Sequence, residues 1–228
     1  MKAVILCGGL GTRLRPITYE IPKVLIPVKG KPVLVHLFDL LKREGIEEVI
    51  LSIGHLGSLI KKQCGDGSRF GMQISYLEES SPLGTAGPLK LLTQQHESFL
   101  VSNGDELKDI PLKEMLTFHN QEQARATIAL TKVENPTLYG VAEMQGTHIK
   151  VFHEKPLNPV ANLVSAGLYI LSPTVQSMVP EGFAMLEQEV FPKLAEEGTL
   201  CGFPFTGQWF DTGNFERYEI AIKNWNGI

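Results

Sequence analysis

The sequence predicts an α/β fold with a doubly wound, mostly parallel β-sheet. In residues 1–135, short apolar runs alternate with segments whose apolar residues recur at helical spacing. The runs are rich in Val, Ile and Leu, as are strands that a parallel sheet buries on both faces. This alternation is typical of consecutive strand–helix–strand units.

The elements of this first part follow one another closely. Residues 3–7 form an unbroken apolar run that ends in a glycine-rich turn, so they are expected to be a buried strand. Residues 32–44 have helical periodicity and stop at Gly45, a typical helix end. By the same criteria we expect strands at 47–54, 72–78, 98–106 and 124–133, and helices at 55–65, 85–96 and 112–123.

After Tyr139 the pattern changes. Residues 139–156 suggest two short strands around a turn at Gln145-Gly146, and 163–173 suggest a further strand. Helices are expected at 183–198 and 215–226. No linker or repeat separates the two parts, so we expect a single domain over 1–228, in which 136–228 elaborate the fold of 1–135.

Composition excludes several classes of protein. The formal net charge of −4 argues against a general nucleic-acid or membrane-surface binder, although a local cationic pocket remains compatible with it. Cys7, Cys64 and Cys201 are odd in number and widely spaced, so they indicate neither a disulfide framework nor a zinc site. The first apolar run is too short for a signal peptide, and a reducing cytoplasm is the expected compartment. The sequence leaves open whether the chain forms a homo-oligomer.

The glycine-rich turn suggests phosphate binding. Gly8, Gly9 and Gly11 directly follow the first strand, at the carboxyl edge where α/β sheets bind ligands. Glycines let backbone N–H groups approach an anion, and Arg13 can add charge. The turn contains no Gly-Lys-Ser/Thr and lacks the dinucleotide spacing. The alternative is a structural turn with surface arginines, and for Arg15 the sequence does not decide between phosphate and solvent.

Three further charged residues fit phosphate chemistry. Lys23 follows Pro22, which limits the entropy it loses on meeting a phosphate. Asp105 ends a buried strand, and Asp211 precedes the final helix. Carboxylates of this kind suit Mg²⁺ bound together with substrate phosphates. Taken singly, each aspartate could equally be a turn or cap residue, and Glu106 is expected to be solvated.

A longer pattern identifies a family. The stretches "GGLGTRLRPIT" and "PKVLIPVKGKPVL" resemble the motif of the sugar-nucleotide pyrophosphorylases, which join a nucleoside triphosphate to a sugar 1-phosphate. The pieces "LGTAGPL", "NGDE", "YGV", "EKP", "SAGLYIL" and "WFDTGN" extend this resemblance over nearly the whole chain. It implies a Rossmann-like, glycosyltransferase-A-like fold, with 1–135 mainly nucleotide-binding and 136–228 mainly sugar-binding.

The resemblance also implies roles for individual residues. Arg13, Lys23 and Asp105 would be catalytic, and Asp105 and Asp211 would hold Mg²⁺. The residues implied to bind the sugar phosphate are Gly140, Glu154, Lys155, Ser165 and Gly167. The residues implied to bind the nucleotide are Leu6, Gly8, Gly9, Gly11, Thr12, Arg13, Lys23, Glu79, Pro82, Gly84, Thr85, Asn103 and Gly104.

Glu79 suggests the base. A carboxylate accepts hydrogen bonds only, and guanine presents two adjacent donors. "PLGTAG" also resembles guanylyltransferases that act on mannose 1-phosphate or a heptose 1-phosphate, so GTP is the expected substrate. Ser165 stands where such relatives often have Asn, which weakens the assignment of mannose.

Several alternatives stay open. The chain could instead use UTP or dTTP with a glucose or N-acetylmuramic acid phosphate, or it could be a non-catalytic sensor of sugar nucleotides. Glu79 would then point to solvent or read another base. A transferase for phosphocholine or a polyol phosphate ranks third, because no aromatic cluster suited to choline stands out.

Overall fold

The structure, a computed structural model, describes all residues from Met1 to Ile228. Packing divides them into two compact units built from discontinuous segments. The first unit comprises Met1–Pro82, Ser102–Ile110 and Gly207–Ile228, and the second comprises Leu83–Val101 and Pro111–Thr206. The expected single domain with halves meeting near residue 135 stays a prediction. No helix is both long and apolar enough to cross a membrane.

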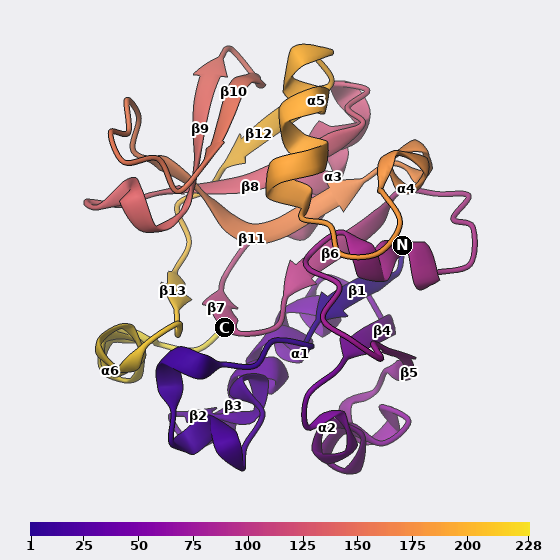
Figure 1. Cartoon of the computed structure of the whole chain (residues 1–228), viewed down its shortest axis with the longest axis vertical. Coiled ribbons are helices and arrows are strands. Elements are labelled where there is room, and N and C mark those ends of the chain that lie inside the picture. Colours follow the sequence, from indigo (N-terminus) through magenta and orange to yellow (C-terminus); the bar gives the residue numbers. More distant parts are fainter. The chain divides into compact units, whose positions relative to one another are not determined.

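The first unit contains the predicted parallel strands. β1 (Ala3–Leu6) pairs in parallel with β4 (Glu48–Ile53), which in turn pairs in parallel with β5 (Gln73–Glu78). These strands occupy the indigo and purple part of the chain in Figure 1. Ala3, Val4 and Ile5 of β1 are buried, as a strand covered on both faces requires.

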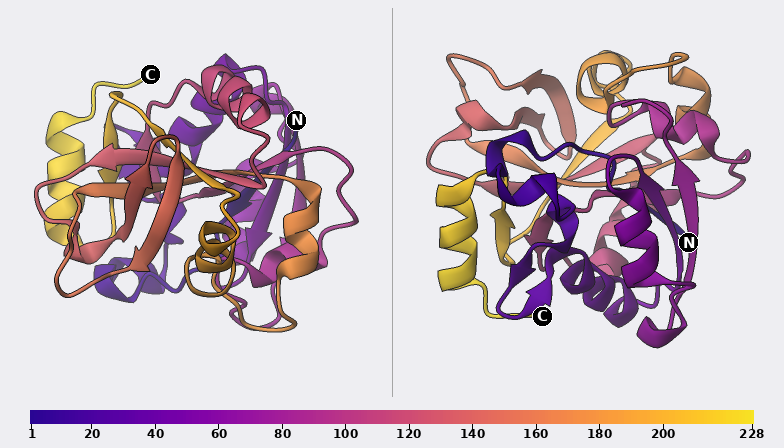
Figure 2. Two further views of the ribbon diagram at one scale, coloured as in Figure 1. Left: turned by 90° about the horizontal axis from the view of Figure 1, so that it is seen from above. Right: turned by 60° about the horizontal axis from the view of Figure 1, so that its bottom comes forward.

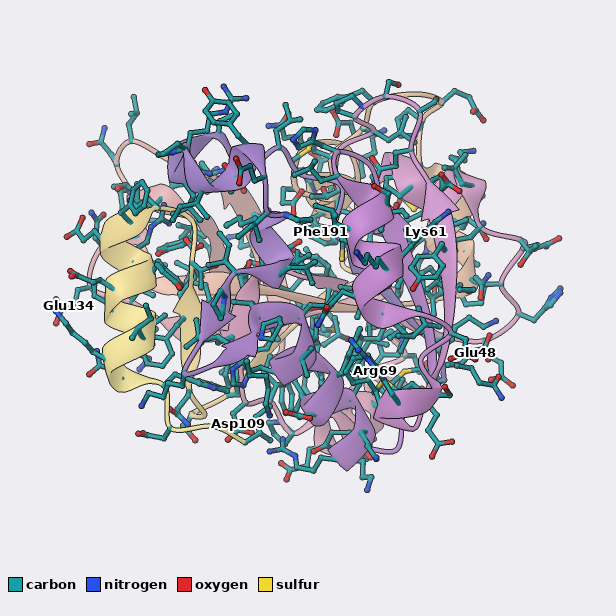
Figure 3. The ribbon with its side chains drawn as sticks, turned by 90° about the horizontal axis from the view of Figure 1, so that it is seen from below. Glu48, Lys61, Arg69, Asp109, Glu134 and Phe191 are labelled. Atoms are coloured by element: carbon teal, nitrogen blue, oxygen red, sulfur yellow. The ribbon has the colours of Figure 1, made fainter.

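Two helices complete these strand–helix units. α1 (Val33–Arg43) buries an apolar stripe and ends at Gly45, whose positive φ of 80° suits glycine. α2 (Gly57–Cys64) follows β4. Lys61 of α2, labelled in Figure 3, forms an ion pair with Glu78 of β5 at 2.5 Å. The predicted helices at 32–44 and 55–65 are therefore confirmed.

Short antiparallel pairs, which the sequence did not predict, complete the first unit. β2 (Pro27–Val28) pairs with β3 (Lys31–Pro32), and β7 (Glu106–Lys108) pairs with β13 (Trp209–Asp211). The last helix, α6 (Phe215–Asn224), runs alongside β13 (Figure 2). Just after α6, the buried Trp225 donates a hydrogen bond to His36 at 3.2 Å and so ties the end of the chain to α1.

The strands of the second unit pair in a different pattern. Their order in the sheet is β11-β8-β12-β10-β9, and β9 also pairs with β11. Only β8 and β12 are parallel neighbours. The strands are β8 (Ala126–Lys132), β9 (Gly140–Gln145), β10 (His148–Glu154), β11 (Leu163–Leu171) and β12 (Leu200–Pro204).

Helices cover this sheet and connect its strands. α5 (Phe191–Glu196) packs against β10 and β12, as Figure 1 shows. The other helices of the unit are α3 (Leu112–Gln121) and α4 (Pro173–Met178). β6 (Phe99–Asn103) starts in the second unit and ends in the first.

The expectation of a mostly parallel sheet is wrong. Taken over both units, the strand pairing is mixed and mostly antiparallel. The reason lies after Tyr139, where the predicted turn at Gln145-Gly146 joins β9 directly to β10. Strands joined by so short a turn must be antiparallel neighbours. The α/β class is confirmed.

Two predicted helices differ from the structure. In place of a helix over 85–96 there is only a 3₁₀ turn, Gly87–Leu91, because the segment bonds a neighbouring loop: the Ala86 N–H donates to the Ala184 carbonyl at 2.9 Å. The segment 183–198 begins with the π-helical turn Leu186–Val190 and becomes α-helical only at Phe191. Pro192, which lacks an N–H, then fits the first turn of α5.

Candidate active site

The glycine-rich turn after β1 has the backbone shape that its sequence suggests. Gly11 adopts a left-handed conformation with φ of 61° and precedes a 3₁₀ turn, Thr12–Leu14. The Thr18 hydroxyl donates to the Gly11 carbonyl at 2.8 Å and holds the turn. Leu14 is buried, whereas Arg13 is exposed and available to a ligand. Arg15 lies over the Tyr19 ring at 4.8 Å, so its guanidinium already has a partner.

Lys23 and Asp105, far apart in the sequence, meet in the first unit. The Lys23 ammonium donates to the Asp105 carboxylate, and the Lys23 side chain is largely buried. Asp105 stands between β6 and β7, and the Gly104 N–H beside it donates to the Leu6 carbonyl at 3.0 Å. The end of β6 is thereby placed next to the start of the glycine-rich turn. These contacts join three of the predicted motifs.

Asp211 is brought to the same place. In the register of β13 and β7, Asp211 pairs with Glu106, the residue after Asp105. The Thr212 hydroxyl donates to the Asp105 carbonyl at 2.7 Å, and Arg217 of α6 donates to the Asp211 carboxylate. The convergence of the two aspartates, which their positions in the sequence cannot reveal, comes from this strand pair.

The electrostatics of this cluster favour a cation. Burial, and then the neighbouring Glu106 carboxylate, raise the pKa of Asp211 to about 6, although Lys23 and Arg217 oppose the shift. Burial also works to raise the pKa of Asp105, but Lys23 outweighs it and holds this pKa below its ordinary value. The carboxylate oxygens are ligands that Mg²⁺ prefers, and a divalent ion would relieve the repulsion between them. The residues therefore fit a Mg²⁺ ion.

Glu106 is not solvated, contrary to the expectation. It is buried, and its carboxylate accepts hydrogen bonds from Asn103 and Trp209, each at 2.9 Å. The fully buried Lys108 pairs with it at 3.2 Å, and burial lowers the pKa of Lys108. Glu106 thus links Asn103, Lys108 and Trp209 through its buried carboxylate, next to Asp105 in the chain. Its burial follows from β7, a strand too short to be recognised in the sequence.

Glu79 lines a pocket of about 290 Å³ in the first unit. The Ser52 hydroxyl donates to the Glu79 carboxylate at 2.8 Å, and a Cβ added to Gly8 would lie 2.5 Å from that carboxylate. Gly8 and Pro82, both predicted to bind nucleotide, line the pocket with Glu79. Leu10, Gly54, His55, Ser80 and Ser81 complete the lining.

The remaining predicted nucleotide residues, Gly84 and Thr85, belong to the second unit. Gly84 has a positive φ of 77°. The Thr85 hydroxyl donates to Glu187 at 2.5 Å and accepts from the Leu186 N–H at 2.9 Å. The Thr85 side chain therefore holds the π-helical turn Leu186–Val190 in place.

Ser165 and Gly167 lie in β11, where the pairing with β8 is irregular. The Gly167 N–H donates to the Ser165 hydroxyl at 3.2 Å, and Gly167 has a positive φ of 56°. Tyr169 donates to Glu187 at 3.0 Å. Sequence reasoning did not single out Tyr169 or Glu187. Glu187 lies next to apolar residues in "MLEQEV". Burial raises the pKa of Glu187.

Gly140, Glu154 and Lys155 come together at one end of the β9–β10 hairpin. Gly140 pairs with Glu154 across the strands, and a Cβ on Gly140 would lie 3.1 Å from the Glu154 carboxylate. Lys155 pairs with Glu154 at 2.5 Å and has a positive φ of 48°. Such a backbone conformation in a residue other than glycine is strained, and strain of this kind clusters at functional sites.

The chain matches the family model described as "Nucleotidyl transferase" over residues 2–226. It belongs to the nucleotidyl transferase family. The membership agrees with the resemblance found in the glycine-rich motif, and it covers both units. The glycine-rich turn, Lys23, Asp105 and Asp211 all lie within the matched residues.

Curated relatives refine the comparison. The chain is 41% identical over 220 residues to the mannose-1-phosphate guanylyltransferase catalytic subunit beta of Xenopus tropicalis, covering 93% of this chain and 61% of the relative. It is 39% identical over 231 residues to mannose-1-phosphate guanylyltransferase 1 of Arabidopsis thaliana, covering 98% of this chain and 64% of the relative. The chain thus spans about three fifths of the length of these relatives.

Solved structures share the fold. HddC from Yersinia pseudotuberculosis, crystallised with GMP-PN, superimposes with a TM-score of 0.84 at 26% identity over 99% of both chains. A protein described as a putative glucose-1-phosphate thymidylyltransferase from Bacillus anthracis gives a TM-score of 0.88 at 26% identity, over 98% of this chain and 94% of that one. The family fold therefore extends over the full chain.

Proposed function

We propose that the chain transfers GMP from GTP to mannose 1-phosphate, giving GDP-mannose and pyrophosphate. The observation that carries the proposal is the contact of Lys23 with Asp105 beside Asp211, next to the start of the glycine-rich turn. This cluster combines the cationic and carboxylate groups that nucleotidyl transfer needs. The guanylyltransferase relatives support GTP and mannose 1-phosphate as the substrates.

In the proposed reaction, an oxygen of the sugar phosphate attacks the α-phosphorus of GTP, and the bond to pyrophosphate breaks. Phosphoryl transfer depends mainly on positioning and on stabilising the negative charge that develops on oxygen. Mg²⁺, held by Asp105 and Asp211, would supply part of that stabilisation by binding phosphate oxygens. Arg13, exposed on the glycine-rich turn, contacts the triphosphate, and Lys23 binds phosphate oxygens of both substrates.

Nucleotide recognition is assigned mainly to the first unit. The backbone of Gly8, Gly9 and Gly11 lies against the triphosphate. Leu6, Thr12, Pro82, Asn103 and Gly104 are also assigned to the nucleotide, as are Gly84 and Thr85. Glu79, oriented by Ser52, accepts hydrogen bonds from N1–H and the 2-amino group of guanine. Uracil and thymine each present a single imide N–H and satisfy only part of this carboxylate.

Sugar-phosphate recognition is assigned to the second unit. Lys155 binds the phosphate, while Glu154 accepts a hydrogen bond from a sugar hydroxyl. Gly140 is assigned a place beside the sugar ring, and glycine is required there because a side chain would strike Phe152 and Glu154. Ser165 and Gly167 contact the sugar from β11.

The three buried thiols fit a reducing cytoplasmic compartment.

Pyrophosphate release tests the proposal. GTP, UTP, dTTP, CTP and ATP would each be combined with mannose, glucose and heptose 1-phosphates in the presence of Mg²⁺. We expect release that requires GTP and mannose 1-phosphate together. Release with UTP or dTTP only would overturn the choice of base, and release with another sugar only would overturn the choice of sugar. Tight binding of GDP-mannose without release from any pair would indicate a non-catalytic sensor.

A further inference from the structure

A second set of metal-binding side chains lies in the second unit. Glu122 follows α3, His148 opens β10, and Cys201 lies in β12. His148 and Cys201 face each other in the antiparallel pairing of β10 and β12. One ligand atom from each of the three residues lies within 4.8 Å of the other two. None of them belongs to the site described above.

The cluster is well separated from the residues assigned to the sugar. His148 is the first residue of β10 and Glu154 is the last. At the rise of an extended strand, these positions are roughly 20 Å apart. An ion at this cluster would therefore contact neither Glu154 nor Lys155.

The donor atoms select a class of metal. Thiolate sulfur, imidazole nitrogen and carboxylate oxygen together suit Zn²⁺ and similar ions, whereas Mg²⁺ and Ca²⁺ take oxygen ligands. Zinc–ligand bonds of about 2.0–2.3 Å place tetrahedral ligands roughly 3.3–3.8 Å apart. The three atoms approach this spacing, and the half-buried side chains of Glu122 and His148 can rotate to reach it. A fourth position would be left for water.

The surroundings of the three side chains hold them in place. Cys201 is fully buried and forms no disulfide. The Thr147 hydroxyl donates to Glu122 at 2.8 Å and lies 3.3 Å from the His148 ring, so it orients both side chains. Hydrogen bonds from neighbouring groups commonly orient the side chains that bind a metal.

We propose that Glu122, His148 and Cys201 bind one zinc-class divalent ion, which ties the end of α3 to the β10–β12 pair. Binding forms one coordinate bond from each side chain and releases the Cys201 thiol proton to solvent. The sequence contains no Cys/His motif at metal-binding spacing, because the three residues come from three separate elements. The proposal does not depend on the proposed function.

Cobalt is the probe for this site. Co²⁺ would be titrated into the full chain with excess Mg²⁺ and a phosphine reductant. We expect one equivalent to produce a thiolate-to-cobalt charge-transfer band in the near ultraviolet, and Zn²⁺ to abolish it. Co²⁺ held only by the carboxylate oxygens of Asp105 and Asp211 would give no such band. Absence of the band in the wild-type chain would overturn the proposal.

Variants assign the ligands. Cys201→Ser should abolish the band, while His148→Gln and Glu122→Gln should each weaken Co²⁺ binding by about tenfold or more. Cys64→Ser and His153→Gln are matched controls, since they alter another buried thiol and another histidine of β10. A band that survives in Cys201→Ser, or that is lost in Cys64→Ser, would contradict the assignment. If Cys201→Ser does not fold, His148→Gln provides the test, because it keeps the thiol. An unchanged Co²⁺ affinity in His148→Gln would then contradict the proposal.

Discussion

The Lys23 ammonium donates a hydrogen bond to the Asp105 carboxylate, across 82 residues of sequence. The lysine neutralises the carboxylate and keeps it ionised, so the pKa of Asp105 lies below its ordinary value despite burial. An ionised carboxylate is the form that binds Mg²⁺. In the proposed reaction, this contact would hold both side chains ready for phosphate and metal.

Replacing Asp105 should remove turnover without unfolding the chain. Asp105→Asn keeps the shape of the side chain but loses the charge that Mg²⁺ and Lys23 need. We expect the rate to fall by about 10²-fold or more, with an unchanged circular dichroism spectrum. Asp109→Asn is the control, because Asp109 lies in the same unit but pairs only with Arg43 near the surface. Near-normal activity and metal dependence in Asp105→Asn would remove Asp105 from the site.

Glu79 should decide the preference for the base. Glu79→Gln replaces one acceptor with a donor, so guanine loses a hydrogen bond while a pyrimidine imide gains a partner. We expect the ratio of kcat/KM for GTP to that for UTP to fall by roughly tenfold to a hundredfold.

The adjacent residue offers a close control for Glu79. Glu78 is exposed and pairs with Lys61, so Glu78→Gln should keep the wild-type ranking of nucleotides. Equal rankings in the two variants would show that Glu79 does not read the base.

Lys155 should act on the sugar phosphate alone. Lys155→Met keeps most of the side-chain volume but removes the charge, so the KM for mannose 1-phosphate should rise by about tenfold or more. The KM for GTP should stay the same. Lys150→Met, an exposed lysine of β10, provides the comparison. A rise in the KM for GTP of the same size would point to a general loss of structure or charge.

His119 should make the stability depend on pH. Its ring is buried between Thr127 at 2.8 Å and Ser98 at 3.2 Å, and burial lowers its pKa from 6.5 to about 4. The unfolded chain therefore binds the proton more readily, so this contribution is complete above pH 6.5 and is lost as the pH falls towards 4. A shift of this size is worth up to about 3 kcal/mol.

Urea unfolding at several pH values measures this contribution. The stability difference between the wild-type chain and His119→Gln should shrink as the pH falls from 7 to 4. His96→Gln, which alters an exposed histidine, should follow the wild-type curve. Parallel curves for the wild-type chain and His119→Gln would exclude a lowered pKa for His119.

Local sequence was sufficient wherever an element depends on its own residues. The apolar run of β1, the periodicity of α1 ending at Gly45 and the turn at Gln145-Gly146 were all predictable, because burial, capping and turn formation act over a few residues. The glycine-rich motif likewise identified the family. Lys23 and Asp105 could be predicted as site residues from their motifs, but the contact between them could not.

The tertiary structure decided what depends on distant residues. The strand pair β7–β13 brings Asp211 beside Asp105 and buries Glu106, and its strands are too short to show a pattern in the sequence. Hydrogen bonds to a neighbouring loop replace the helix expected at 85–96. The antiparallel pairs β11–β8 and β10–β12 join strands that are not consecutive in the chain. Strand order, burial of charge and convergence of side chains all depend on partners far along the chain, and no local pattern encodes them.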